Sequence, residues 1–232
     1  MNIVITGASK GIGYAIAEIF AAQGHDLYLT SKTPASLDTA VAQLSKQYSN
    51  VQIKSLPADL SIQSELTAFA NWCLQHTKPD ILINNAGHFV PGQLQNETEG
   101  QLQDQLNTNL FSAYHLTRAL LPSMLSRKSG HIFNICSIAS LAAYENGGAY
   151  SISKFALLGF SKNLRLELKD QGIKVTAVCP GAVFTNSWAG SGVDPKRIME
   201  SSDIAKMIYA ASQLSPQAVV EDIVMRPQLG DL

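Results

Sequence analysis

Tyr150 and Lys154 lie four residues apart, near the start of a segment whose apolar residues recur with a helical period. Positions i and i+4 share one face of a helix, so the phenol and the ammonium are expected to lie side by side. A free phenol has a pKa of about 10, and a neighbouring ammonium favours the phenolate and lowers that value. The pair is therefore a candidate acid-base group. An ordinary Tyr/Lys pair on a helix is the alternative, because this spacing is common.

A glycine-rich turn near the N-terminus is a second candidate site. It follows a strand-like run that ends at Thr6, and an amphipathic helical pattern follows it. Glycines allow close approach to a pyrophosphate, and the free N–H groups of a helix start attract anions. The spacing is G-x-x-x-G-x-G, which is neither the common G-x-G-x-x-G pattern nor a Walker A loop, and a purely structural tight turn is the alternative. The predicted dinucleotide contacts are Gly7, Ser9, Lys10, Gly11, Ile12 and Gly13.

Cofactor choice is read at the end of the second strand, where Ser31 and Lys32 are expected to meet the adenosine ribose. A carboxylate there would hold a 2′-hydroxyl, whereas a cation would accept a 2′-phosphate. No acid occupies this edge, since Asp26 lies at the opposite end of the strand. Lys32 and Lys10 together indicate a preference for NADP(H) over NAD(H), unless both are simply solvated surface lysines.

Strand-like apolar runs alternate with longer helical patterns along the whole chain, which is typical of a parallel sheet covered on both faces. We therefore predict the α/β class: a single Rossmann-type, doubly wound domain over residues 1–232, with a seven-stranded parallel sheet. Residues 181–201, rich in Gly, Ser, Asn and Pro, are predicted to form a substrate loop. The expected strands are 2–6, 26–30, 51–56, 80–84, 131–137, 174–179 and 219–225, and the expected helices are 12–23, 34–48, 62–76, 99–127, 148–170 and 202–214.

Composition narrows the functional class. The 232 residues are 46% hydrophobic and 15% charged, with 17 basic and 18 acidic side chains, which argues against disorder, nucleic-acid binding and a membrane-surface partner. No apolar run reaches the length of a membrane span and no signal peptide is recognised, so we expect a cytoplasmic protein. The scattered Cys73, Cys136 and Cys179 are expected to be buried thiols, and neither they nor the five histidines show metal-ligand spacing.

In combination, the motifs resemble the short-chain dehydrogenase/reductase family along essentially the whole chain. The matching pieces occur in the order and spacing of that family: 6–13, Asn84-Asn85-Ala86-Gly87, Asn109, Ser137, Tyr150-x-x-x-Lys154 and Pro180-Gly181. The first 180 residues resemble β-ketoacyl carrier-protein reductases. Residues 180–188 and the ending 220–231 are instead similar to bacterial sepiapterin-reductase-like members, and the glycine-rich V-D/N-G-G ending of the carrier-protein reductases is missing.

The resemblance implies a role for each catalytic candidate. Tyr150 would exchange a proton with the substrate oxygen while hydride moves to or from the nicotinamide, and Lys154 would favour the phenolate and hold the nicotinamide ribose. Ser137 would bind the same oxygen, and Asn109 would hold a water that joins Lys154 to solvent. Further cofactor contacts are implied at Asp59, Leu60, Asn85, Ala86, Gly87, Pro180, Gly181, Val183 and Thr185.

The expected activity is NADP(H)-dependent transfer of hydride between nicotinamide and a carbonyl or secondary alcohol, on a sepiapterin-reductase-like ketone. A 3-oxoacyl carrier-protein reductase and a non-catalytic dinucleotide sensor are the alternatives. Phe89, Tyr144 and Trp188 are candidate pocket walls, which suit a bicyclic or aromatic carbonyl and equally a medium acyl chain. The long apolar segments 99–127 and 148–170 exceed the needs of one covering face, and family members use these helices to form homodimers or homotetramers.

Overall fold

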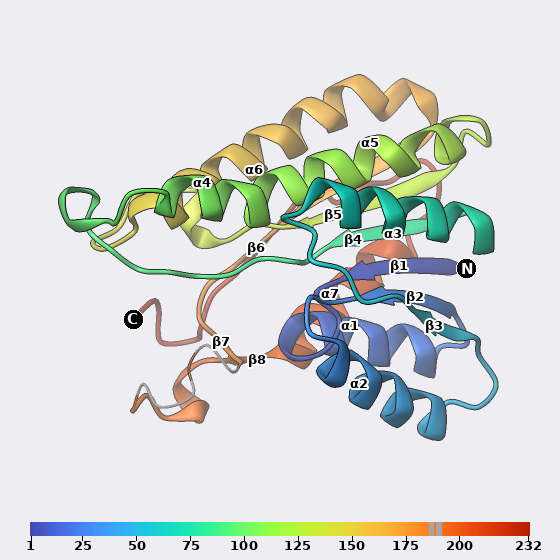
Figure 1. The fold of residues 1–232 in the computed structure, drawn as a ribbon, viewed down its shortest axis with the longest axis horizontal. Helices are drawn as coiled ribbons and strands as arrows, with labels where there is room; N and C mark the ends of the chain where they lie inside the picture. The colour runs from blue at the N-terminus through green and yellow to red at the C-terminus, as the bar shows by residue number, and fades with distance from the viewer. Residues whose placement is uncertain (186–187, 189–191) are drawn as a thin grey trace.

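The computed structural model describes residues 1–185, 188 and 192–232, and a seven-stranded parallel sheet forms its centre (Figure 1). The strand order is β3-β2-β1-β4-β5-β6-β9, which confirms the predicted class and the doubly wound sheet. The winding direction reverses between β1 and β4, and ligands of such sheets bind at the carboxyl edge beside that point. The strands are β1 (Asn2–Thr6), β2 (Asp26–Thr30), β3 (Ile53–Ser55), β4 (Ile81–Asn84), β5 (Gly130–Ile135), β6 (Ile173–Pro180) and β9 (Asp222–Met225).

Apolar cores form on both faces of the sheet because side chains of a strand alternate between the faces. On β1, Ile3 and Ile5 pack with α1, α2 and α7, whereas Val4 packs with α3, α5 and α6. Figure 1 shows these two groups of helices on opposite sides of the sheet. The helices are α1 (Gly11–Ala22), α2 (Pro34–Gln47), α3 (Gln63–His76), α4 (Gln101–Leu106), α5 (Ser112–Leu125), α6 (Gly148–Leu168) and α7 (Ser201–Ser212).

The expected continuous helix over residues 99–127 is wrong in one respect. A π-helical turn at Asn107–Phe111 separates α4 from α5. Such turns insert one residue into the helical ladder and are frequent at functional sites. The inserted turn carries Asn109, which is buried and bonded to other segments. Hydrophobic periodicity does not reveal such an insertion, because the helical pattern continues on both sides.

The predicted substrate loop contains more regular structure than its composition indicates. A two-stranded parallel sheet joins β7 (Val183–Phe184) to β8 (Met199–Glu200), and a short 3-10 helix covers Pro195–Arg197. The guanidinium of Arg197 donates hydrogen bonds to the carbonyl oxygens of residues 229–231, which fixes this segment to the end of the chain. Residues 186, 187 and 189–191 of the predicted loop lie outside the described residues.

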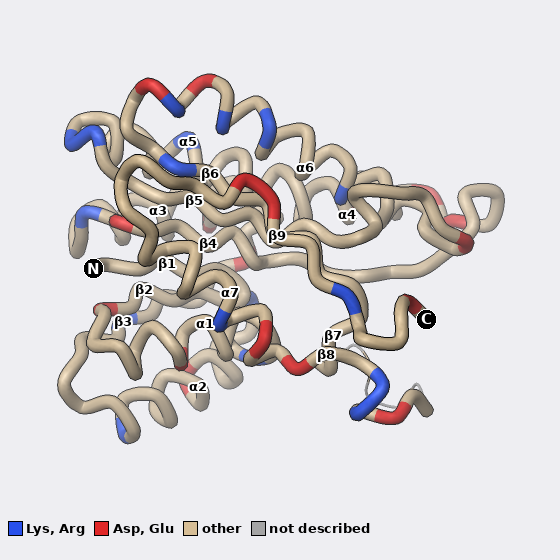
Figure 2. The backbone as a smooth tube through the Cα atoms, turned by 180° about the vertical axis from the view of Figure 1, so that it is seen from behind, with Lys and Arg blue, Asp and Glu red and all other residues tan. Residues whose placement is uncertain are grey.

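Ion pairs join α6 to the start of β9. Lys162 pairs with Asp222, and Arg165 Nε lies 3.0 Å from Glu221 Oε1. Figure 2 shows basic positions of α6 beside acidic positions at the start of β9. Within the described residues, no helix is both long enough and apolar enough to cross a bilayer.

Candidate active site

The ends of β1, β4 and β5 bring three of the predicted motifs together. β4 pairs with β1 on one side and with β5 on the other. All three strands run in parallel, so their carboxyl ends lie at one edge of the sheet. The glycine turn after Thr6, the run 84–87 and Ser137 therefore occupy neighbouring positions at this edge.

The glycine turn has no room for a side chain at Gly13. A Cβ atom there would overlap the carbonyl oxygen of Gly7 and would lie 2.5 Å from Asn85 Nδ2. Gly7 itself has a φ of +63°, in the left-handed region that favours glycine. The side chain of Lys10, the N-cap residue of α1, makes no capping hydrogen bond to the N–H groups of the first turn. These donors and the helix dipole fit a phosphate group.

Asn85, which directly follows β4, stabilises the glycine turn through hydrogen bonds. Its Nδ2 donates to the carbonyl oxygens of Thr6, at 2.9 Å, and Gly7, at 3.1 Å. In return, Thr6 Oγ1 accepts hydrogen bonds from the backbone N–H groups of Asn85 and Ala86. The side-chain amide nitrogen of Asn85 therefore stabilises the conformation of the glycine turn.

The predicted acid-base pair lies on the first turns of α6. Lys154 is 6% exposed, and its Nζ donates to the carbonyl oxygen of Ile135 at 2.8 Å. The same Nζ lies 5.8 Å from the centre of the Tyr150 ring. Because Ile135 ends β5 two residues before Ser137, this bond fixes the ammonium between the sheet edge and the tyrosine.

Ser137 lies in a short turn that is tied to the same helix. Its Oγ accepts a hydrogen bond from the backbone N–H of Ala139 at 3.1 Å. Ser137 thereby caps the start of a 3-10 helix over Ile138–Ser140. Ser151 Oγ donates to the carbonyl oxygen of Ala139 at 3.0 Å. Since Ser151 directly follows Tyr150, this bond holds the Ser137 turn against the first turn of α6.

Asn109 links the π turn to two other parts of the site. Its Oδ1 accepts the N–H of His88 at 2.9 Å, and its Nδ2 donates to the His88 carbonyl oxygen at 3.1 Å and to Ser153 Oγ at 2.9 Å. A Cβ at Gly87 would lie 3.0 Å from Asn109 Oδ1 and 3.5 Å from Lys154 Nζ. Asn109, Gly87 and Lys154 therefore meet at one point.

The end of β2 holds the residues predicted to choose the cofactor. Ser31 is buried, and its hydroxyl has no hydrogen-bond partner among the described residues, which fits a ligand hydroxyl at this edge. Lys32 Nζ lies 2.8 Å from Asp59 Oδ2, so these two predicted cofactor contacts pair with each other. Burial would raise the pKa of Asp59, but hydrogen bonds from Lys32 and Ser61 outweigh it and hold the pKa below its ordinary value.

The remaining cofactor candidates lie around the same edge. Leu60 is buried in the core under α3, and Val183 is buried on β7. Gly181 donates its N–H to the carbonyl oxygen of Met225 at 2.8 Å, which joins the segment after Pro180 to the end of β9. A Cβ at Gly11 would lie 3.1 Å from Thr185 Cγ2, so the start of the predicted loop lies on the glycine turn.

Two of the three predicted pocket residues lie beside Tyr150. The Phe89 ring meets the Tyr150 ring edge-on, with 4.7 Å between the centroids. Burial, with a smaller contribution from neighbouring Tyr150, raises the pKa of Tyr144 to about 12. Both Phe89 and Tyr144 are about half exposed. Trp188 donates its N–H to the carbonyl oxygen of Thr185 at 3.0 Å.

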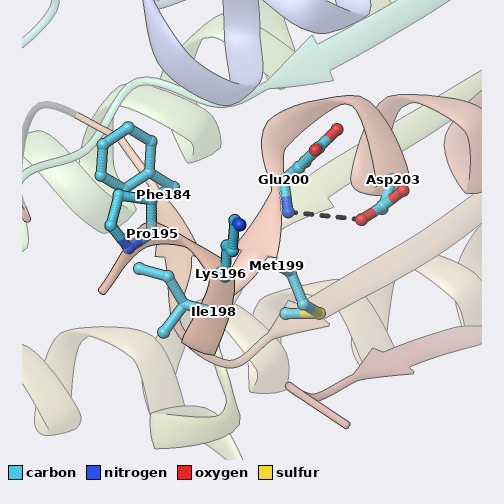
Figure 3. Close-up of a pocket in the computed structure, with 7 residues that line it drawn as sticks. All are labelled: Phe184, Pro195, Lys196, Ile198, Met199, Glu200 and Asp203. Atoms are coloured by element: carbon cyan, nitrogen blue, oxygen red, sulfur yellow. Dashed lines mark hydrogen bonds between the residues drawn. The ribbon is translucent and has the colours of Figure 1, made fainter. Parts of the chain in front are cut away.

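A cavity of about 630 Å³ is lined by residues of the predicted substrate loop and by Asp203, not by Tyr150. Figure 3 shows Phe184 and Pro195 at one end and Glu200 and Asp203 at the other. Its described lining comes entirely from residues 184–203, so it adjoins the loop and contains none of the acid-base groups. The described lining residues are Phe184, Pro195, Lys196, Ile198, Met199, Glu200 and Asp203.

Sequence reasoning missed a pairing of thiols below the site. Cys136 directly follows β5 and Cys179 lies on β6, and the neighbouring Cys179 thiol together with burial raises the pKa of Cys136. In the sequence they are far apart, and only the register of β5 and β6 brings them together. The described residues contain no cluster of three or more His, Cys, Asp or Glu side chains that could hold a metal ion.

Comparison with known proteins identifies the family. The sequence profile of the short-chain dehydrogenases matches residues 1–195. The chain belongs to the short-chain dehydrogenase family. It is accordingly an oxidoreductase that acts on CH–OH or C=O groups with a nicotinamide dinucleotide.

Individual relatives agree with this assignment. The chain is 34% identical to a sepiapterin reductase of Chlorobaculum tepidum, over 99% of this chain and 97% of that protein. It is 36% identical to a putative ketoacyl reductase of the monensin polyketide synthase of Streptomyces virginiae, over 78% of this chain and 70% of the relative. A short-chain dehydrogenase of Sphingobium yanoikuyae in complex with NADPH has a TM-score of 0.85 and 31% identity, with 95% of this chain and 87% of that chain covered.

Proposed function

We propose that this chain is an NADP(H)-dependent carbonyl reductase in which Tyr150 is the general acid and base. The observation that carries the proposal is the buried Lys154 ammonium. It is held by the Ile135 carbonyl oxygen next to the Ser137 turn, and it lies 5.8 Å from the Tyr150 ring centre. A fixed cation beside a phenol favours the phenolate, which the reaction needs when the proton is transferred.

The residues of this centre divide the steps of the proposed reaction among them. In reduction, Tyr150 donates its hydroxyl proton to the substrate oxygen, and in oxidation it removes that proton. Ser137 donates a hydrogen bond to the same oxygen and orients it. Lys154 favours the phenolate and holds the ribose. Asn109 supports the turn at Gly87–His88 beside Lys154, and its proposed water contact would use the second lone pair of Oδ1.

The cofactor site is assigned to the glycine turn and the end of β2. The uncapped first turn of α1 would hold the pyrophosphate, and the unpartnered Ser31 hydroxyl would meet the ribose. Lys32, held at this edge by Asp59, would attract a 2′-phosphate together with Lys10. When bound, the dinucleotide supplies or accepts the hydride. A relative that binds NADPH supports the preference for NADP(H).

For the substrate, we propose a ketone on a planar ring system, as in sepiapterin reductases. The 34% identity to such a protein extends over nearly the whole of both chains. The exposed faces of Phe89 and Tyr144 beside Tyr150 offer stacking surfaces for a ring. A 3-oxoacyl thioester is the second candidate, supported by the 36% identity to a putative ketoacyl reductase.

We further propose that the protein is a homodimer or homotetramer through α5 and α6. Five large apolar side chains on the π turn, α5 and α6 are at least 37% exposed, and they would be covered by a second copy. They are Phe111, Tyr114, Ile152, Phe155 and Leu166.

A carbonyl screen tests the proposed function. The substrates are a pteridine side-chain ketone, a β-ketoacyl thioester, an aromatic diketone and a small aldehyde, each with NADPH or NADH. We expect NADPH oxidation with the pteridine ketone, and Tyr150→Phe should abolish turnover while it leaves NADPH affinity nearly intact. Full activity of Tyr150→Phe would refute the mechanism. NADPH binding without turnover on any substrate would favour a dinucleotide sensor.

A further inference from the structure

A carboxylate from a distant segment caps the helix that carries Tyr150. Glu97 Oε1 accepts the backbone N–H of Ala149 at 2.6 Å. Ala149 is the second residue of α6 and directly precedes Tyr150. The N-cap residue of α6 is Gly147, which has no side chain to satisfy the free donors of the first turn. A carboxylate there satisfies one such donor and interacts favourably with the helix dipole.

The backbone around this contact leaves room for the carboxylate. Gly148 has a φ of +41°, and a Cβ at this position would overlap both Glu97 Oε1 and the carbonyl oxygen of Gly92. The N–H of Gly92 donates to the carbonyl oxygen of Asn146 at 3.0 Å. Two separate contacts therefore join the segment after β4 to the residues that lead into α6.

The same segment also contacts the Tyr150 ring itself. Phe89 packs edge-on against that ring, and Gln105 Nε2 donates to the carbonyl oxygen of Val90 at 3.1 Å. Glu97 is partly buried, whereas residues 93–96 and 98–100 on either side of it are exposed. The segment thus holds Tyr150 at two points, its ring through Phe89 and its helix start through Glu97.

We propose that Glu97 is a positioning residue for the reaction, because its carboxylate fixes the first turn of α6 and with it the Tyr150 hydroxyl relative to Ser137 and Lys154. This inference rests on the proposed role of Tyr150. A small displacement of a reacting group lowers the rate strongly without weakening contacts elsewhere. The cofactor contacts assigned to α1 and β2 lie on other elements, and Lys154 is held separately by the Ile135 carbonyl oxygen, so the loss should fall on kcat and spare NADPH binding.

The experiment compares Glu97→Ala and Glu97→Gln with a matched control. Glu99 is exposed and makes no hydrogen bond or ion pair among the described residues, so Glu99→Ala changes the charge of the same segment without removing the cap. The measurements are kcat and KM for the best ketone of the screen, the Kd for NADPH by fluorescence, and the thermal unfolding midpoint of the full chain.

We expect Glu97→Ala to lower kcat about tenfold and to leave the NADPH Kd within about twofold of the wild type. Glu97→Gln should recover most of kcat, because its amide oxygen still accepts the Ala149 N–H, and Glu99→Ala should match the wild type. If Glu97→Ala does not fold, Glu97→Asp, which is one methylene shorter, takes its place with the same expectation.

Three results would overturn the inference: an unchanged kcat, an equal loss of kcat and NADPH affinity, or a Gln variant as impaired as the Ala variant. Tyr150→Phe measured in parallel separates this inference from the proposed function. If Tyr150→Phe is inactive and Glu97→Ala is fully active, only the role of Glu97 is wrong. If Tyr150→Phe is active, the proposed function fails as well.

Discussion

Ser151 donates its hydroxyl hydrogen to the carbonyl oxygen of Ala139 at 3.0 Å, and both residues are buried. The bond crosses from α6 to the 3-10 turn that Ser137 begins. It therefore connects α6, which carries the proposed acid-base residue Tyr150, to the turn that carries Ser137, the proposed hydrogen-bond donor to the substrate oxygen. Their contact holds the Ser137 turn against the first turn of α6, and we expect it to set how Ser137 faces Tyr150.

Ser151→Ala should therefore reduce turnover through geometry. Removing the Ser151 hydroxyl leaves the buried Ala139 carbonyl oxygen without this hydrogen bond, which should lower the unfolding free energy by about 1–3 kcal/mol. We expect kcat to fall several-fold while NADPH affinity stays near that of the wild type. Ser126→Ala is the control, because Ser126 also donates to a backbone carbonyl but is exposed and remote from the site. Equal kcat values for both variants would show that the Ser151 bond has no role in positioning.

The alternation of strands and helices was sufficient to predict the sheet. Each buried parallel strand appears in the sequence as a short apolar run with turn residues on both sides. Predicted ends were less accurate at the sheet margins. β3 covers only Ile53–Ser55 of the expected 51–56, and it pairs with β2 alone. Strand length at an edge depends on the partner, which local sequence does not specify.

For the site, the motifs marked the residues on strand ends and on α6, because these have characteristic types and spacing. The supporting contacts had no such signal. Glu97, Ser151 and Ser153 are ordinary polar residues in sequence, and only the folded chain brings them to Ala149, Ala139 and Asn109. Glu97 is 52 residues from Ala149 in the sequence, so no local pattern links it to α6. A hydroxyl beside the candidate tyrosine is too common to be specific.

The ion pair between Lys32 and Asp59 leads to a prediction about cofactor choice. Lys32 is highly exposed, so its pairing with Asp59 is weak in water and does not prevent contact with a phosphate. We expect Lys32→Ala to raise the KM for NADPH about tenfold, the order of one charge-assisted hydrogen bond, and to leave the KM for NADH nearly unchanged. Lys46→Ala, an exposed lysine of α2, should leave both values unchanged. An unaltered NADPH-to-NADH ratio in Lys32→Ala would refute this role.

Assembly can be tested on the apolar face of α6. Phe155 is 45% exposed on this helix, and a charge there would have to be buried on association. We expect Phe155→Glu to shift the protein from an oligomer to a smaller species in light scattering at micromolar concentration. Leu74→Glu on α3, where Leu74 is 42% exposed, should leave the mass unchanged. A monomeric wild type would contradict the proposed interface.

Stability at acid pH should depend on His131, which is buried on β5. Thr176 Oγ1 donates its one hydrogen to the Val220 carbonyl oxygen at 2.6 Å. It therefore accepts a hydrogen bond from His131 Nε2 at 2.8 Å, which the neutral imidazole ring can donate. Burial, with a smaller contribution from Lys174, lowers the pKa of His131 to about 3. The unfolded chain, with an ordinary histidine pKa of about 6.5, takes up the proton first.

The His131 contribution is therefore complete above pH 6.5 and is lost as the pH falls toward 3, at about 1.4 kcal/mol per pH unit. Between pH 7 and pH 5 it should lower the unfolding free energy by about 2 kcal/mol. Urea unfolding at both pH values tests this, because His131→Gln, although less stable at pH 7, should lack this part of the pH dependence. His76→Gln, which changes an exposed histidine, should keep the wild-type dependence. An identical pH dependence in His131→Gln and the wild type would mean that His131 does not titrate between the two states.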